Sequence, residues 1–204
     1  MTSALTAIQR LGRNVFTTRE AANCRRASVS GTAQALRGLA EKGILLKVTK
    51  GVWCLQAGGA GISAYRLIPF LLSGRAYVSF ISALHLHGMI EQIPQEITLA
   101  STGHTKTIRT PFGTFRIHQL APSFFKGFDW YKGSGSFLIA EPEKAFVDCL
   151  YLSVRKKKQF GHFPELRFPK SFRFSKVKAW AMGIADPKAR SAVLKKLEDY
   201  RGHL

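Results

Sequence analysis

The chain has 204 residues, which is enough for one large domain or two small ones. Its 31 Lys and Arg residues against 12 Asp and Glu residues give a formal net charge of +19, which predicts a polyanionic partner such as DNA, RNA or an acidic surface. A hydrophobic content of 46% with 15 Phe argues against a disordered chain, and no apolar run approaches the ~18 residues of a membrane span, so no membrane partner is expected.

The N-terminus and the cysteines indicate a cytoplasmic protein. Residues 1–10 lack the charged start and the long apolar core of a signal peptide. The 3 Cys residues are widely spaced, with no CxxC motif and no Cys/His spacing suited to zinc, which is typical of reduced thiols. We therefore expect a cytoplasmic location, no metal site and no cofactor.

The start of the chain predicts two helices separated by a short strand. A helix is expected over residues 3–11, and residues 15–16 form a strand that pairs with a later hairpin. Thr17 or Thr18 caps a short second helix, with Glu20 in its first turn. These elements lead directly into the most informative part of the sequence.

A longer helix is expected over residues 29–42, between the N-cap residue Ser28 and Gly43. At about 100° per residue, one of its faces is apolar and suited to packing, whereas the opposite face is small and polar enough for a backbone to approach closely. The apolar face carries Val29, Ala33, Leu36, Leu39 and Ala40, and the polar face carries Ser30, Gly31, Gln34 and Gly38, flanked by Arg37 and Glu41.

Two β-rich segments follow at residues 44–48 and 52–55, joined by a tight turn at Lys50-Gly51. A short helix, a turn, a longer helix and a hairpin in this order predict a winged helix-turn-helix, which is a DNA-reading module. The alternative is a helical pair that only packs, with a solvated basic rim. We favour DNA binding because positive residues gather at the turn, the helix start and the hairpin.

The expected DNA contacts divide into two kinds. The start of the longer helix presents free N–H groups that suit a phosphate, and base edges are read by polar side chains on the helix. Phosphates are assigned to Arg25, Arg26, Lys47 and Lys50, and base edges to Ser30 and Gln34. With Ser28, Arg37 and Thr49, these residues form the predicted DNA surface.

A Gly-rich linker at residues 57–61 separates a winged helix-turn-helix domain over residues 1–57 from a second domain over residues 62–204. The second domain begins with helical patterns, and from residue 96 the period changes to two. Strands are expected at residues 97–100, 105–110 and 114–120. The predicted fold class is therefore α+β, with an N-terminal winged helix-turn-helix followed by a mixed α+β C-terminal domain that has an antiparallel sheet.

The second half of this domain holds an aromatic loop and a basic end. Residues 121–135 are expected to be a loop, and its aromatic residues could form a lid over the sheet, a partner-binding patch or a base-stacking surface. They are Phe124, Phe125, Phe128, Trp130 and Tyr131. From Val154 onward the chain has 14 Lys and Arg against 4 Asp and Glu, so this end predicts a polyanionic or acidic partner of its own.

An enzymatic alternative rests on a group of charged residues near one helix start. Glu141, Glu143 and Asp148 could hold a metal ion as in a metal-dependent nuclease. However, the segment opens a helix, where Glu141 caps and Pro142 occupies the first position, and Asp148 forms a plain i,i+4 pair with Lys144. We favour helix capping over catalysis, and no enzymatic activity is expected.

Several segments together resemble one family. Phe16-Thr-Thr-Arg-Glu-Ala-Ala, residues 35–45 and Lys50-Gly-Val-Trp-Cys-Leu resemble the N-terminal winged helix of the AbiEi-type antitoxins. Residues 77–90, Thr110-Pro-Phe-Gly-Thr-Phe and residues 139–152 resemble landmarks of their C-terminal domain. The resemblance covers most of the chain from Ala4 to Ser153, and the last segment is the most specific.

The resemblance implies a non-enzymatic antitoxin of a type IV toxin–antitoxin system, of the kind found in abortive infection. Such an antitoxin represses its own operon by binding double-stranded operator DNA with inverted repeats. It also counters a nucleotidyltransferase-like toxin encoded beside it, through its C-terminal domain. By position, Ser28, Ser30, Gln34 and Lys50 would fall on the DNA-facing surface. A stand-alone transcriptional regulator without a toxin partner is the alternative.

Overall fold

The computed structural model describes residues 2–56, 62–72, 74–133, 137–155, 160 and 165–202, and over these the chain is a mixed α+β protein. It divides into two compact units, Met1–Ser73 with Arg109–Gly113, and Gly74–Ile108 with Thr114–Leu204. The linker predicted at residues 57–61 lies outside the described residues, and the first unit continues beyond it. None of the described helices is long and apolar enough to cross a membrane.

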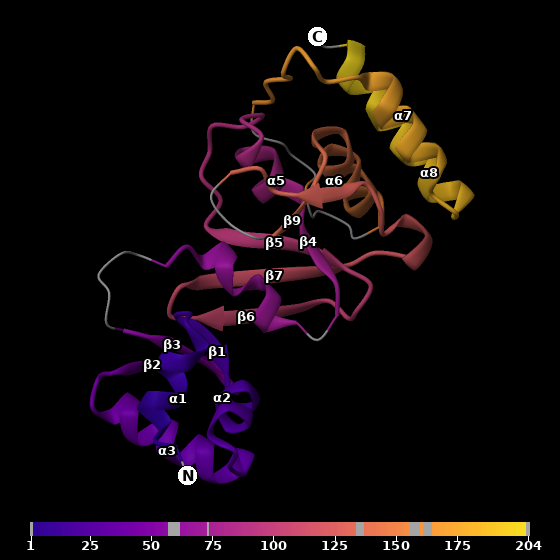
Figure 1. Ribbon diagram of the computed structural model, residues 1–204. Helices are drawn as coiled ribbons and strands as arrows, with labels where there is room; N and C mark the ends of the chain where they lie inside the picture. The colour runs from indigo at the N-terminus through magenta and orange to yellow at the C-terminus, as the bar shows by residue number, and fades with distance from the viewer. Residues whose placement is uncertain are drawn as a thin grey trace. The chain divides into compact units, whose positions relative to one another are not determined.

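The first unit opens with helices and strands at the positions that the sequence predicted (Figure 1). In chain order these are α1 (Ala4–Leu11), β1 (Val15–Thr17), α2 (Thr18–Arg25), α3 (Val29–Glu41), β2 (Leu45–Thr49) and β3 (Val52–Leu55). A 3-10 turn, η1 (Ala64–Leu67), and a short helix, α4 (Ile68–Leu71), follow. Pro69 lies in the first turn of α4, where a missing N–H leaves no helix hydrogen bond unmade.

The three strands of this unit form an antiparallel sheet in the order β1-β3-β2. β1 pairs with β3 so that Phe16 lies opposite Trp53, which confirms the predicted pairing of this strand with the hairpin. Both rings are buried in one apolar cluster with Ile8 from α1 and Leu36 from α3. The cluster holds the helices on the sheet, and it thereby fixes which face of α3 is exposed.

The second unit contains a six-stranded sheet with helices packed on it (Figure 1). Its elements are β4 (Ala76–Val78), α5 (Phe80–Leu86), β5 (Glu96–Ser101), β6 (Lys106–Thr110), β7 (Gly113–Gln119), η2 (Pro122–Phe124), β8 (Phe128–Trp130), β9 (Leu138–Ala140), α6 (Pro142–Arg155), α7 (Phe174–Met182) and α8 (Pro187–Gly202). The turn of the β6–β7 hairpin, Arg109–Gly113, is the part of this sheet that is grouped with the first unit. The strand β8 lies inside the segment that was predicted to be a loop. It pairs antiparallel with β9 at the edge of the sheet.

The sheet of the second unit is mixed, with the strand order β6-β7-β5-β4-β9-β8. β5 runs antiparallel to β4 and parallel to β7, and β4 runs parallel to β9. The prediction of an antiparallel sheet therefore holds for the β4–β5 and β8–β9 pairs and is wrong for the β5–β7 and β4–β9 pairs, which are parallel. The physical reason is that the hairpin of β6 and β7 places its second strand, not its first, beside β5.

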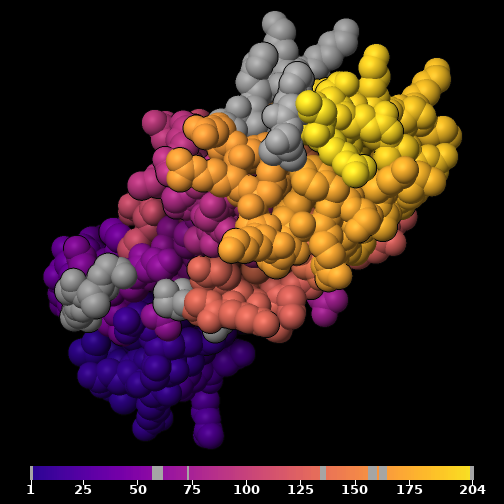
Figure 2. Space-filling model, turned by 90° about the horizontal axis from the view of Figure 1, so that it is seen from above, coloured from indigo at the N-terminus to yellow at the C-terminus, as the bar shows by residue number. Residues whose placement is uncertain are grey.

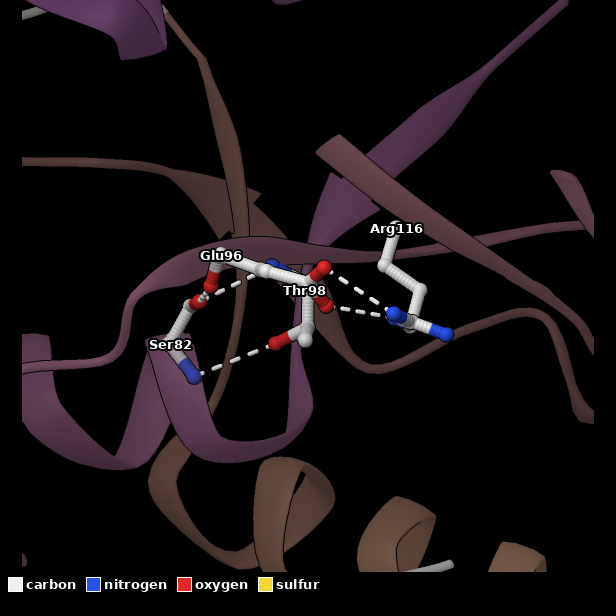
Figure 3. Close-up of polar contacts among 4 residues, drawn as sticks. All are labelled: Ser82, Glu96, Thr98 and Arg116. Carbon is white, nitrogen blue, oxygen red and sulfur yellow. Dashed lines mark hydrogen bonds and ion pairs between the residues drawn. The ribbon is translucent and has the colours of Figure 1, made fainter. Parts of the chain in front are cut away.

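Helix α5 is fastened to β5 by reciprocal hydrogen bonds (Figure 3). Ser82 N donates to Thr98 Oγ1 at 3.2 Å, and Thr98 N donates to Ser82 Oγ at 2.8 Å. On the neighbouring strand β7, Arg116 Nη2 donates to Glu96 Oε1 at 2.9 Å. Thr98 lies opposite Arg116 in the parallel pair, so these contacts hold both the helix and the strand in register on β5.

Helix α6 is the centre of the second unit, because its residues 143–152 are all buried. It contacts α5, α7, α8 and β9. The Lys144 ammonium pairs with Asp148 Oδ1, and Asp148 Oδ2 accepts hydrogen bonds from Ser79 Oγ at 2.7 Å and Tyr77 Oη at 3.1 Å. Burial and the nearby Asp148 carboxylate raise the pKa of Tyr77, so its hydroxyl remains a donor. The predicted i,i+4 pair is present, and it lies in the interior of the unit.

Most of the aromatic segment at residues 124–131 packs over the core. Phe124 is buried, and the rings of Phe125 and Phe128 lie 5.0 and 4.5 Å from the ring of Tyr77. Trp130 on the edge strand is the exception, since 61% of it is exposed. Figure 2 shows α7 and α8, in orange and yellow, side by side at the surface of this unit.

Candidate nucleic-acid interface

The turn between α2 and α3 is short and tightly hydrogen-bonded. Arg26, which follows α2, has a left-handed backbone with φ of 54°, and its N–H donates to Asn23 O at 3.1 Å. Ser28 then begins α3 by accepting a hydrogen bond from Gly31 N at 3.1 Å. A left-handed backbone favours Gly. Arg26 therefore places a cation in the turn at the cost of a strained backbone conformation.

The two arginines of this turn have different environments. Arg25 Nη1 donates to Thr32 Oγ1 at 3.1 Å, and its Nε donates to Thr2 O at 3.4 Å. Since Thr32 is buried on α3, Arg25 ties α2 to α3 in addition to carrying charge. Arg26 is exposed and has no ion pair with a carboxylate among the described residues. Arg26 is therefore the better placed of the two to meet a phosphate.

Helix α3 presents the polar face that its sequence predicted. On this face Ser30, Gly31 and Gln34 are exposed and Gly38 is half-buried, the flanking Arg37 and Glu41 are exposed, and so is the N-cap residue Ser28. No acidic residue lies in the first turn of the helix, so the positive end of its dipole is not neutralised locally. The buried face is centred on Thr32 and Leu36.

Val29 was predicted to pack, and this prediction is wrong, because the residue is 51% exposed. It shares the helical face of Leu36, but it stands at the first position of α3, where the core has already ended. Periodicity gives the direction of a side chain around a helix axis and not how far the neighbouring elements extend along it.

The hairpin of β2 and β3 is attached to the start of α2. Thr18 N donates to Gly51 O at 2.9 Å, and Trp53 Nε1 donates to Thr18 Oγ1 at 2.8 Å. Lys47 and Lys50 are exposed on this hairpin, and Thr49 is half-buried beside an irregularity in the strand pairing. At about 1.5 Å per residue, α2 separates the attached turn from the α2–α3 turn by roughly 12 Å, or three to four base-pair steps.

The charge of this region is one-sided. Residues 1–56 contain nine Lys and Arg against two Glu, Glu20 and Glu41. Glu20 is engaged in the capping box of α2 with Thr17 and in an ion pair with Arg13. Burial acts to raise the pKa of Glu20, but the hydrogen bonds from Thr17 and the charge of Arg13 lower it below its usual value. This carboxylate therefore stays ionised, and its partners are Thr17 and Arg13. The cations on the turn and hairpin thus remain largely uncompensated.

Two of the three carboxylates of the nuclease alternative, Glu141 and Glu143, approach the same Lys176 ammonium at 2.7 and 3.8 Å, and the third, Asp148, has other partners. Asp148 is fully buried and held by Lys144, Tyr77 and Ser79, whereas Glu141 pairs with Lys176 at 2.7 Å. Glu143 accepts a hydrogen bond from Arg173 N at 3.1 Å. Among the described residues, no group of three His, Cys, Asp or Glu side chains could hold a metal ion.

Three features of this surface were missed by sequence reasoning. They are the exposure of Val29, the left-handed backbone of Arg26 and the attachment of the hairpin through Thr18 and Trp53. A Thr at the start of a helix and a Trp in a hairpin give no local signal that they bond across 35 residues. No protein-family model and no curated protein matches the chain.

Proposed function

We propose that the first unit is a winged helix-turn-helix that binds double-stranded DNA and represses transcription of its own operon. The observation that carries this proposal is the exposed face of α3, which combines small polar side chains with a helix start free of acidic residues. Exposed cations on the β2–β3 hairpin and on the α2–α3 turn lie near opposite ends of α2. The length of this helix is a separation that suits two phosphates of one DNA backbone.

The roles within this surface follow from chemistry. Arg26, Lys47 and Lys50 neutralise phosphates, which gives affinity without sequence information. Gln34 can bond both N6 and N7 of adenine in the major groove, and Ser30 can bond any base edge within reach. Arg25 holds α2 and α3 together through Thr32 and carries its charge next to Arg26 in the sequence.

For the second unit we propose the antitoxin role that the resemblance implies, directed against a nucleotidyltransferase-like toxin. Support comes from the matching segments at residues 77–90 and 139–152, which include β4 with α5 and β9 with α6. A neighbouring gene for such a transferase, whose growth arrest this chain relieves on co-expression, would favour the antitoxin. A lack of relief would favour a stand-alone regulator.

The first test is fluorescence anisotropy with a duplex from directly upstream of the gene, a scrambled duplex and a salt series. The upstream duplex should bind at least about a thousandfold more tightly, with log affinity falling linearly in log salt. Gln34→Ala should lose roughly ten- to a hundredfold for the upstream duplex alone, because it removes base contacts. Lys50→Ala should weaken both duplexes equally and reduce the salt slope by about one.

The outcomes of this test separate three explanations. Equal binding of both duplexes by the unmodified chain would reject sequence-specific regulation and leave only nonspecific electrostatic binding of polyanions. No binding at moderate salt would reject DNA as the partner. An equal loss of both duplexes in Gln34→Ala would reject base reading by Gln34 while leaving the winged helix-turn-helix in place.

Arg26 should show opposite effects on folding and on binding. Replacing Arg26 with Gly is expected to stabilise the chain by about 1 kcal/mol, because Gly adopts the left-handed backbone without strain. The same change should weaken all duplexes equally, since a phosphate contact is lost. Arg26→Lys is the control, because it keeps the charge and the strain. Urea denaturation and anisotropy measure the two effects, and a fall in stability on Arg26→Gly would contradict the strain.

A further inference from the structure

The half-exposed side chain of Val29 is not among the residues of the buried apolar cluster of the first unit or those packed against it. It is the first residue of α3, and 51% of it is exposed although the apolar cluster of this unit includes Leu36 from the same face. A β-branched residue is a weak helix former, and an apolar side chain gains nothing from water. Ser28 and Ser30 on either side are polar and exposed.

We propose that Val29 reads thymine, by placing its methyl groups against the C5-methyl group of a thymine in the major groove. This inference rests on the proposed DNA binding of α3. The N-terminal residues of a recognition helix are those that reach base edges, and Val29 is the first of them. The thymine methyl is the apolar group on the major-groove edge, and an apolar side chain is its natural contact.

The assignment complements the polar readers on the same helix. Gln34 bonds adenine through hydrogen bonds, whereas Val29 contributes only apolar contact. The two residues are five positions apart, which is about 7.5 Å along α3 and about 140° around its axis, so Val29 reaches DNA only because it stands at the open end of the helix, and it contacts a different base pair from Gln34. The operator half-site therefore contains a thymine contacted by the start of α3, and its recognition depends on one methyl group.

The test removes the methyl groups from DNA without changing its hydrogen-bonding groups. The upstream duplex is synthesised with thymine and again with uracil at every thymine position, and both are titrated with the full chain. We expect the chain to bind the thymine duplex about fourfold more tightly for each contacted methyl. Val29→Ala should show a smaller preference for the thymine duplex than the unmodified chain, because only one methyl carbon remains at this position.

Leu5→Ala is the matched control, because Leu5 is an apolar residue of α1 that is 40% exposed. It should keep the full preference for thymine. Equal binding of both duplexes by the unmodified chain, or a thymine preference that is undiminished in Val29→Ala, would overturn the proposal. These results are separate from a failure of the proposed function, in which the upstream thymine duplex would bind no better than a scrambled thymine duplex.

Discussion

Replacing Asp148 with Ala should destabilise the chain by about 3–5 kcal/mol, because the Lys144 ammonium would remain buried without its partner. Both side chains are 0% exposed, and the ammonium lies 3.9 Å from the ring centroid of Phe124. The aromatic faces of Phe124 and Tyr77 attract the cation but do not replace a carboxylate. Urea denaturation of the full chain measures the change in unfolding free energy.

The double variant Lys144→Met with Asp148→Leu is the control for this effect. It replaces the pair with apolar side chains of similar volume, and such replacements are often neutral or stabilising. It should recover much of the stability lost in Asp148→Ala, although the hydroxyls of Ser79 and Tyr77 lose their acceptor. A double variant that is less stable than the single variant would show that the ion pair itself does not explain the loss.

Gly127→Ala should destabilise the chain by about 2–4 kcal/mol, combining backbone strain with overpacking. Gly127 has φ of 78°, and an added Cβ would lie 2.6 Å from Cζ2 of Trp180 and 3.0 Å from Cγ of Lys144. The same contacts show that this glycine lets the aromatic segment close over α6. Thermal and urea unfolding of the variant give the size of the loss.

Gly88→Ala separates the two contributions to the Gly127 effect. Gly88 has a similar φ of 68°, but an added Cβ would meet no atom within 4 Å. It should therefore cost only the backbone strain, about 1–2 kcal/mol. If the two variants lose the same stability, close packing against Trp180 is not a constraint at position 127.

Local sequence signals were sufficient for most elements and insufficient for their arrangement. Capping residues and apolar periodicity predicted α1, α3, α6 and the β6–β7 hairpin, because each signal lies within the element that it specifies. The parallel pairing of β5 with β7 was not predictable in this way, because it depends on which strand of a hairpin meets a distant neighbour. The edge strand β8 was missed because three residues are too few to show a period.

In the candidate DNA surface, too, local features could be predicted from the sequence and contacts between elements could not. The exposure of Ser30, Gln34 and Lys50 could be expected from the opposite, apolar face of α3 and from the turn at Lys50-Gly51. The hydrogen bond from Arg25 to Thr32 could not be expected, since Arg25 was assigned to a phosphate and nothing in the sequence pairs it with a residue of the next helix. Burial of Lys144 was equally unexpected, because an i,i+4 pair in sequence does not reveal what packs on it.

The attachment of the hairpin to α2 has a consequence for the kinetics of recognition. Thr18 bonds both Gly51 and Trp53, so the segment that carries Lys50 is already ordered before any ligand arrives. A preordered contact loses little conformational entropy on association, and the encounter complex needs no slow rearrangement. Under the proposed DNA binding, association would be governed by electrostatic steering, and differences among DNA sequences would appear in how long each complex survives.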